Sequence, residues 1–188
     1  MNNIEINKNR IITRLFTASA IAVLVIFGSS YFYTPQVKIS NFDEARDTEF
    51  ILDLFKKNWH WLVAEGTTFS PEYMLKYRAS SQDSSKDHGK EIIKVLYEGN
   101  EPVGFVAYHK INFFKCMLHF LAVREEFRSK GYGLQLLQYA VNDLIARGCA
   151  EITLVTRTNN YPAQKVYKKV GFKETHRTNG FVYFSYIV

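Results

Sequence analysis

The chain has 188 residues, of which 47% are hydrophobic and 22% charged, and this balance excludes an intrinsically disordered protein. Its length suits one globular domain with a short appendage. The formal net charge of +6 allows a solvated basic surface, attraction to an anionic membrane or binding of a polyanionic ligand such as a nucleotide. Nucleic-acid binding is not expected, because the basic residues are scattered along the chain.

The first predicted element is an apolar helix near the N-terminus. Residues 15–33 contain no charged residue and no histidine, and these about 19 residues approach the ~20 that a helix needs to cross a bilayer. Pro35 follows and ends the helix. We therefore expect a basic tail over residues 1–14 and an uncleaved transmembrane helix over residues 15–33. A cleaved signal peptide and a buried core helix remain open alternatives.

The first half of the remaining chain carries signals for helices, a loop and a hairpin. Residues 43–61 have apolar side chains at helical spacing, and Ser70 is the N-cap of a second predicted helix. The polar residues 80–90 are typical of a loop, and Gly99 gives a hairpin signal. The predicted strands of this half are residues 37–42, 92–97 and 103–108.

The second half alternates strands and helices, which indicates that part of the sheet is parallel. Residues 133–147 place apolar side chains on one helical face, and residues 162–170 form a shorter helix that ends at Gly171. The predicted strands are residues 115–123, 151–156 and 181–188. Residues 37–188 are therefore expected to form one α/β domain, a mixed sheet flanked by helices.

The cysteines and histidines give no sign of a disulfide or metal framework. Cys116 and Cys149 are too few for a disulfide framework, and neither belongs to a Cys-x-x-Cys motif. Cys116 is expected to be a small buried apolar residue within a strand. The five histidines show neither His-x-x-x-His nor Cys/His ligand spacing, so we predict no metal site.

The most informative segment is the glycine turn from Arg128 to Gly133, between a predicted strand and a predicted helix. Glycines let successive backbone N–H groups point toward a phosphate, and the helix N-terminus adds free donors with a partial positive charge. Arg128 and Lys130 add full charges at the rim. The turn matches neither a Walker loop nor a dinucleotide motif, and by itself it is equally typical of an ordinary turn before a helix.

The residues around this turn resemble the signature of the GNAT superfamily of N-acetyltransferases. The R/Q-x-x-G-x-G/A motif of that family is matched by Arg128-x-x-Gly131-x-Gly133, and its pantetheine-binding strand by Leu121-Ala122-Val123. Its second conserved block is resembled by Asn160-x-x-Ala163-x-x-x-Tyr167-x-x-x-Gly171-Phe172. The resemblance covers residues 37–188, and its sharp motifs run from residue 118 to residue 172.

The resemblance implies a V-shaped cleft in the sheet, with acetyl-CoA bound in it as the co-substrate. The backbone of Leu121 and Val123 would pair with the pantetheine arm, and Asn160 would lie near it. An N–H group near Leu121 would polarise the thioester carbonyl. The backbone N–H groups that would hold the pyrophosphate belong to Arg128, Ser129, Lys130, Gly131, Tyr132 and Gly133.

Tyr167 is expected to be the general acid that protonates the departing thiolate. A tyrosine titrates near pH ~10 and a thiol near ~8.5, so the proton transfer is uphill by roughly 2 kcal/mol and remains feasible. The same position equally suits a tyrosine that only packs on an amphipathic helix.

His119 is the candidate general base, because imidazole titrates in a suitable range. Strand alternation puts His119 on the same face as Leu121 and Val123. A histidine satisfied within the core is the alternative role, and the loop carboxylates Glu125 and Glu126 are weaker candidates for the base.

The residues and the resemblance together predict an N-acetyltransferase that moves an acetyl group from acetyl-CoA to a primary amine. The acceptor would be a small molecule, a peptide or a protein, and it would attack directly in a ternary complex. A catalytically silent acyl-CoA-binding membrane protein is the alternative. Because acetyl-CoA is abundant in the cytosol, we expect a single-pass membrane protein whose domain lies in the cytoplasm.

Overall fold

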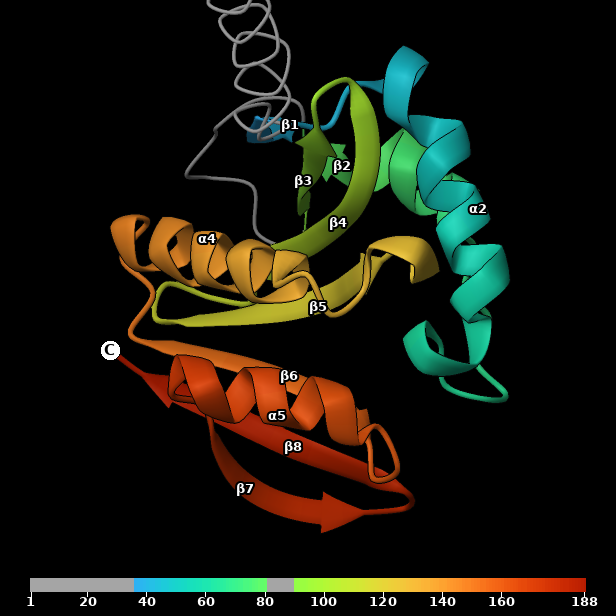
Figure 1. Cartoon of the computed structure of the whole chain (residues 1–188). Helices are drawn as coiled ribbons and strands as arrows, with labels where there is room; N and C mark the ends of the chain where they lie inside the picture. The colour runs from blue at the N-terminus through green and yellow to red at the C-terminus, as the bar shows by residue number, and fades with distance from the viewer. Residues whose placement is uncertain (1–35, 81–89) are drawn as a thin grey trace, which may run out of the picture. The chain divides into compact units, whose positions relative to one another are not determined.

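In the computed structural model, residues 36–80 and 90–188 are described, and they form the strands and helices shown in Figure 1. Their strands are β1 (Val37–Asn41), β2 (Ala79–Ser80), β3 (Glu91–Glu98), β4 (Glu101–Lys110), β5 (Lys115–Val123), β6 (Glu151–Arg157), β7 (Lys173–Thr178) and β8 (Phe181–Ile187). Their helices are α2 (Glu44–Leu62), α3 (Pro71–Tyr73), α4 (Tyr132–Ala146) and α5 (Tyr161–Val170), with a π-helical turn at Met74–Arg78 and a 3₁₀ turn at Glu125–Phe127.

The predicted membrane span requires a correction. No helix within residues 36–80 and 90–188 is long and apolar enough to cross a bilayer, and the longest, α2, carries charged residues throughout its sequence. This finding does not support the predicted transmembrane helix, and it overturns the predicted single-pass membrane protein with a cytoplasmic domain. The segments on which they rested, residues 1–14 and 15–33, lie outside the described residues.

One mixed sheet organises the described residues. Its strand order is β1-β3-β4-β5-β6-β8-β7, and β2 pairs with β3 beside this path. Along the path, β5 and β6 are parallel and all other neighbours are antiparallel. Parallel neighbours need a crossover connection, and α4 supplies it between β5 and β6.

Helices cover both faces of this sheet and build a hydrophobic cluster on each. The cluster under α4 and α5 includes Leu136 of α4 and Val106 of β4. The cluster under α2 includes Leu54 of α2 and Phe105 of β4. Successive residues of β4 thus enter opposite clusters, as strand alternation requires. The predicted α/β domain, a mixed sheet flanked by helices, is confirmed.

Two elements differ from the sequence prediction. Strand β7 was not predicted, because all six of its residues are exposed and it lacks apolar alternation, yet it pairs along the outer edge of β8. The helix predicted after Ser70 is only Pro71–Tyr73, capped by the Ser70 side chain, before the chain continues as a π-helical turn.

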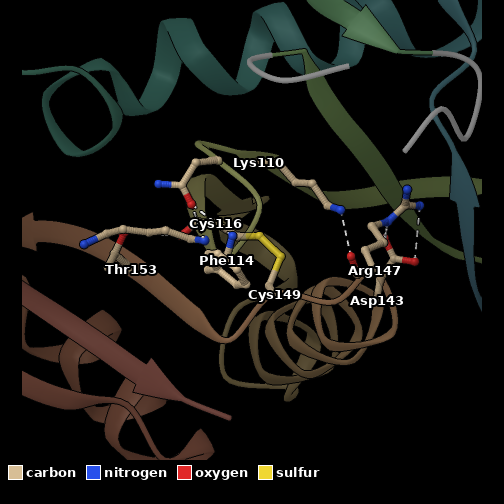
Figure 2. The surroundings of a disulfide bond; sticks show 9 residues. Lys110, Phe114, Cys116, Asp143, Arg147, Cys149 and Thr153 are labelled. Atoms are coloured by element: carbon tan, nitrogen blue, oxygen red, sulfur yellow. Dashed lines mark hydrogen bonds and ion pairs between the residues drawn. A yellow bond between two sulfur atoms is a disulfide. The ribbon is translucent and has the colours of Figure 1, made fainter. Parts of the chain in front are cut away.

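The prediction for the two cysteines is also corrected, because Cys116 and Cys149 form a disulfide that was not predicted (Figure 2). Cys116 lies on β5, and Cys149 lies in the turn between α4 and β6, with their Cα atoms 6.0 Å apart. Both side chains are buried. The crossover through α4 brings the two residues together across a sequence separation of 33. The bond therefore ties the end of the crossover back to the start of β5.

Candidate active site

The site is built where β5 and β6 separate. Their parallel pairing covers three residue pairs and ends at Met117 and Thr153, although β5 continues to Val123 and β6 to Arg157. Beyond that point the two strands do not pair with each other, and two cavities lie along the resulting cleft. The larger has a volume of about 750 Å³ and the smaller about 400 Å³. The V-shaped cleft that the sequence implied is thus present.

The larger cavity gathers nearly all the residues expected to bind the cofactor. Its lining includes Leu121, Val123, Arg128, Ser129, Gly131, Tyr132, Gly133 and Asn160. Lys130 is the exception among them, because its ammonium lies 4.7 Å from the centre of the Phe127 ring instead of in the lining. Residues separated along the chain therefore converge on one cavity, as the motifs indicated.

The turn before α4 has the backbone conformation that an anion site requires. Ser129 and Gly131 have positive φ angles of 65° and 87°, and Gly131 is the N-cap of α4. No side chain caps this helix, so its first N–H groups are free of a side-chain acceptor. Because free N–H groups and the helix dipole both favour negative charge, this end of the cavity suits a phosphate.

Arg128 lies at the rim of this turn. Its Nε donates to the Val123 carbonyl oxygen at 3.3 Å, and its Nη2 donates to Asn58 Oδ1 at 2.7 Å. Asn58 itself marks a break in α2, with φ −119° and ψ 21°. The arginine therefore bridges β5 and the opposite wall of the cavity, and its guanidinium adds positive charge beside the helix N-terminus.

The side chain of Tyr132 makes its contacts within the protein. The ring is buried next to Phe127, and its hydroxyl donates to the Glu98 carboxylate. Only the backbone of Tyr132 is therefore suited to a ligand in the turn.

Asn160 and Tyr167 lie where the two cavities meet, because both residues line both. Asn160 is the N-cap of α5: its Oδ1 accepts from the Ala163 N–H at 3.4 Å, and its Nδ2 donates to Thr156 Oγ1 at 3.1 Å. These bonds fix the start of the helix that carries Tyr167.

The Tyr167 ring packs against Phe172 and Phe184, with ring centroids 6.3 and 5.8 Å away. Burial raises the pKa of its phenol to about 12. The hydroxyl therefore stays protonated at neutral pH, as a proton donor must, but it is a weaker acid than an exposed tyrosine.

The structure corrects the face on which His119 lies. Ala107 pairs with Phe120 and Tyr108 with Leu118, so His119 is an extra residue, a β-bulge, in β5. The bulge reverses the alternation: Leu121 and Val123 pack toward the α4 and α5 side. The His119 ring instead stacks on Phe120 at 3.8 Å between centroids, on the α2 side. His119 still lines the smaller cavity.

His119 is held by a carboxylate that sequence reasoning missed. Its Nδ1 lies 2.7 Å from Oε1 of Glu91, the first residue of β3, and Nδ1 of His109 on β4 lies 3.2 Å from the same oxygen. Burial disfavours the charge of Glu91, but the two neighbouring histidines outweigh it and lower the pKa of Glu91 to about 2. The pairing of β3 with β4 could have revealed this group, because it places Glu91 opposite His109.

The other candidates for a base are less suitable. Glu125 and Glu126 lie in the 3₁₀ turn after β5, and neither is in the lining of the two cavities described above.

Comparison with known proteins finds acetyltransferases. The acetyltransferase (GNAT) family model matches residues 49–172. The [ribosomal protein bS18]-alanine N-acetyltransferase of Haemophilus ducreyi is 43% identical over 54 residues, which cover 29% of this chain and 37% of that protein. The N-alpha-acetyltransferase 30 of Xenopus laevis is 32% identical over 83 residues, which cover 42% of this chain and 30% of that protein. The chain thus matches about a third of the length of these relatives.

Solved structures share the fold. The PaiA N-acetyltransferase of Thermoplasma acidophilum, determined in complex with coenzyme A, aligns with a TM-score of 0.64 and 18% identity. The alignment covers 81% of this chain and 99% of that protein. At this identity the likeness concerns the fold alone.

Proposed function

Since the chain belongs to the acetyltransferase (GNAT) family, we propose that it transfers the acetyl group of acetyl-CoA to a primary amine in a ternary complex. Membership places it among the acyltransferases, and the co-substrate of GNAT acetyltransferases is acetyl-CoA. One observation carries the proposal: a cavity beside a helix N-terminus meets a second cavity at Tyr167. A donor and an acceptor bound in the two would meet there.

In this proposal the larger cavity holds the cofactor. The pyrophosphate would accept hydrogen bonds from the backbone N–H groups of residues 128–133, beside the positive end of α4. The pantetheine arm would pair with the backbone of Leu121 and Val123, because β5 has no strand partner there on its β6 side. Arg128 would shift from the Val123 carbonyl to the phosphates, since a guanidinium binds phosphate more strongly than a neutral carbonyl.

We assign the general base to His119. Glu91 is ionised and can only accept, so the bond between them requires the proton on Nδ1 of His119. In the neutral form of the ring, Nε2 can then accept a proton from the attacking amine. Glu91 acts as a positioning residue, because it fixes the tautomer and orientation of the imidazole.

The reaction then follows from these positions. The amine nitrogen attacks the thioester carbon, and an N–H group near Leu121 stabilises the oxyanion that forms. The amine proton passes to His119 Nε2. The C–S bond breaks, and the Tyr167 hydroxyl donates its proton to the departing sulfur.

The acceptor class that we propose is the α-amine of a peptide or protein. The names of the two relatives above indicate acetylation of a protein alanine and of an α-amine. An α-amine titrates near ~8 and a lysine near ~10.4, so an α-amine is more often neutral at pH 7 and needs less help from a base. The aromatic walls of the smaller cavity, Trp61, Phe69 and Phe181, suit a first side chain.

A CoA-release assay on the full chain tests the proposal. Peptides with a free α-amine should release CoA and gain an acetyl group, whereas the same peptides with a blocked α-amine and a free lysine should react more slowly. Polyamines, free amino acids and aminoglycosides complete the panel. Tight CoA binding without transfer to any of these amines would favour the alternative of a silent acyl-CoA-binding protein.

A further inference from the structure

Glu91, His109 and His119 form a compact group on the sheet face covered by α2, which we call the Glu–His–His cluster. They come from three neighbouring strands, β3, β4 and β5. Glu91 precedes Ile92, which pairs with Tyr108, and His109 follows Tyr108. The bulge at His119 brings the third side chain to the same place. Spacing along the chain gives no sign of this group, because strand register and one extra residue assemble it.

The hydrogen bonding of this cluster is incomplete. Glu91 is fully buried, yet its Oε2 has no hydrogen-bond partner among the side chains of residues 36–77 and 90–188. His109 Nδ1 likewise lacks a well-directed hydrogen bond there, although it lies 3.2 Å from Glu91 Oε1. Buried polar atoms rarely remain without a partner, so two such atoms in one group point to a ligand there.

From this cluster we propose a binding site for a divalent transition metal of the Zn²⁺ type. The donors are one carboxylate oxygen and one nitrogen from each of two histidines, and these atoms lie within 4.8 Å of one another. Tetrahedral Zn²⁺ with bonds of ~2.0–2.2 Å separates its ligands by roughly 3.3 Å. The two histidine Nδ1 atoms lie 2.7 and 3.2 Å from Glu91 Oε1, and no two donor atoms of the group are more than 4.8 Å apart, so side-chain rotations can bring them to that spacing.

The donor types favour zinc over the hard cations. Imidazole nitrogen suits Zn²⁺, Cu²⁺, Ni²⁺ and Fe²⁺, whereas Mg²⁺ and Ca²⁺ prefer oxygen ligands. Two histidines and one glutamate leave a fourth position open on Zn²⁺. The His119 side chain is 28% exposed and lines the smaller cavity, so water from that cavity could complete the coordination.

Metal binding would compete with catalysis, and this consequence rests on the proposed role of His119. A metal at Nδ1 leaves the ring proton on Nε2, so the ring could no longer accept a proton from the amine. The family reaction requires no metal, so the bound ion would inhibit the enzyme. Binding itself can be measured without any acetyl transfer, which keeps the two proposals separable.

The test is a titration of the untagged, chelator-treated full chain with Co²⁺, followed by competition with Zn²⁺. We expect one Co²⁺ per chain with the visible absorption of a tetrahedral complex, and Zn²⁺ should displace it. His119→Gln and Glu91→Gln should each weaken binding by about 100-fold or more, since loss of even an outer-shell partner costs 10–100-fold. Thermal unfolding and CoA binding check that each variant is folded. If the buried change Glu91→Gln prevents folding, His119→Gln still tests the site, because the His119 ring is partly exposed.

His176→Gln is the matched control, because His176 lies on the exposed strand β7, stacked on Tyr183 and away from the cluster. It should bind Co²⁺ like the unchanged chain. Absence of the tetrahedral absorption, or equal Co²⁺ affinity in the unchanged chain and the His119→Gln variant, would overturn the proposal. Inhibition of acetyl transfer by Zn²⁺ is a separate readout and tests only the link to His119.

Discussion

Tyr167 is the residue on which the proposed chemistry depends most. Tyr167→Phe keeps the packing against Phe172 and Phe184 and removes only the hydroxyl. We expect kcat to fall by about 10²–10⁴-fold, the usual contribution of general acid–base catalysis, while CoA affinity stays unchanged. Steady-state kinetics with acetyl-CoA and calorimetric titration with CoA measure the two effects. Full activity in this variant would leave Tyr167 a packing residue.

Asp47 gives a residue-scale prediction about stability and pH. It is fully buried, accepts two hydrogen bonds of 2.9 Å from Arg46, and accepts another from the Tyr97 hydroxyl. Burial opposes its charge, but the bonds from Arg46 and Tyr97 lower the pKa of the carboxyl below 3.8. Because the pKa of Asp47 is lower in the folded state than in the unfolded state, its charge stabilises the fold at pH values above the unfolded-state pKa. This stabilisation is lost as the pH falls from the unfolded-state pKa through the folded-state pKa.

Asp47→Asn should therefore lower the free energy of unfolding by about 1.5–3 kcal/mol at pH 7, the usual worth of a hydrogen bond to a charged group. The difference from the unchanged chain should shrink as the pH falls below the ordinary aspartate pKa of about 3.9. Urea denaturation at several pH values measures it, and Asp53→Asn, which alters a pair of exposed side chains with Lys57, serves as the control. A difference that does not depend on pH would show that the charge of Asp47 contributes nothing.

Among the elements, the turn before α4 is the one that we expect to bind phosphate. Gly131→Ala places a Cβ at a φ of 87°, where nothing lies within 4 Å, so the cost is backbone strain of about 1–2 kcal/mol. The strained turn should bind CoA at least several-fold more weakly. Gly99→Ala is the matched control, because Gly99 also has a positive φ and open space but lies in the β3–β4 hairpin. Equal CoA affinity in both variants would argue against the turn as the pyrophosphate site.

The disulfide is the second element-scale feature that can be tested. Its loop spans a sequence separation of 33, and closing such a loop typically stabilises a fold by about 2–4 kcal/mol. Reduction should therefore lower Tm and expose two titratable thiols after unfolding. In a Cys116→Ala, Cys149→Ala double variant the reductant should have no effect. An unchanged Tm after verified reduction would contradict the predicted contribution.

The order of elements was largely predictable from sequence, since apolar periodicity and glycine stops mark α4, α5 and the buried strands. That most of the residues named for the cofactor line one cavity was predictable as well, because they lie in two local motifs. Their binding of the cofactor stays a prediction. The Glu–His–His cluster and the disulfide were not, because register and the α4 crossover bring their residues together. The face of His119 was missed for the same reason: a bulge breaks the alternation on which the prediction relied.

At the scale of the whole molecule, two cavities lie along one cleft, and the proposed function gives each of them one substrate. The α4 side supplies the helix N-terminus and the unpaired end of β5 to one cavity, and the α2 side supplies His119, whose ring Glu91 holds, to the other. Tyr167 and Asn160 lie where these sides meet. The parting of β5 from β6 after Met117 is what allows both cavities to reach the same place.

Hydrogen–deuterium exchange of the full chain with and without CoA tests this central claim most directly. CoA should slow exchange of the backbone amides of residues 121–123 and 128–133, because those N–H groups would gain ligand acceptors. The amides of the β7–β8 edge should be unaffected and provide the internal reference. Protection elsewhere, or no protection at saturating CoA, would contradict the account.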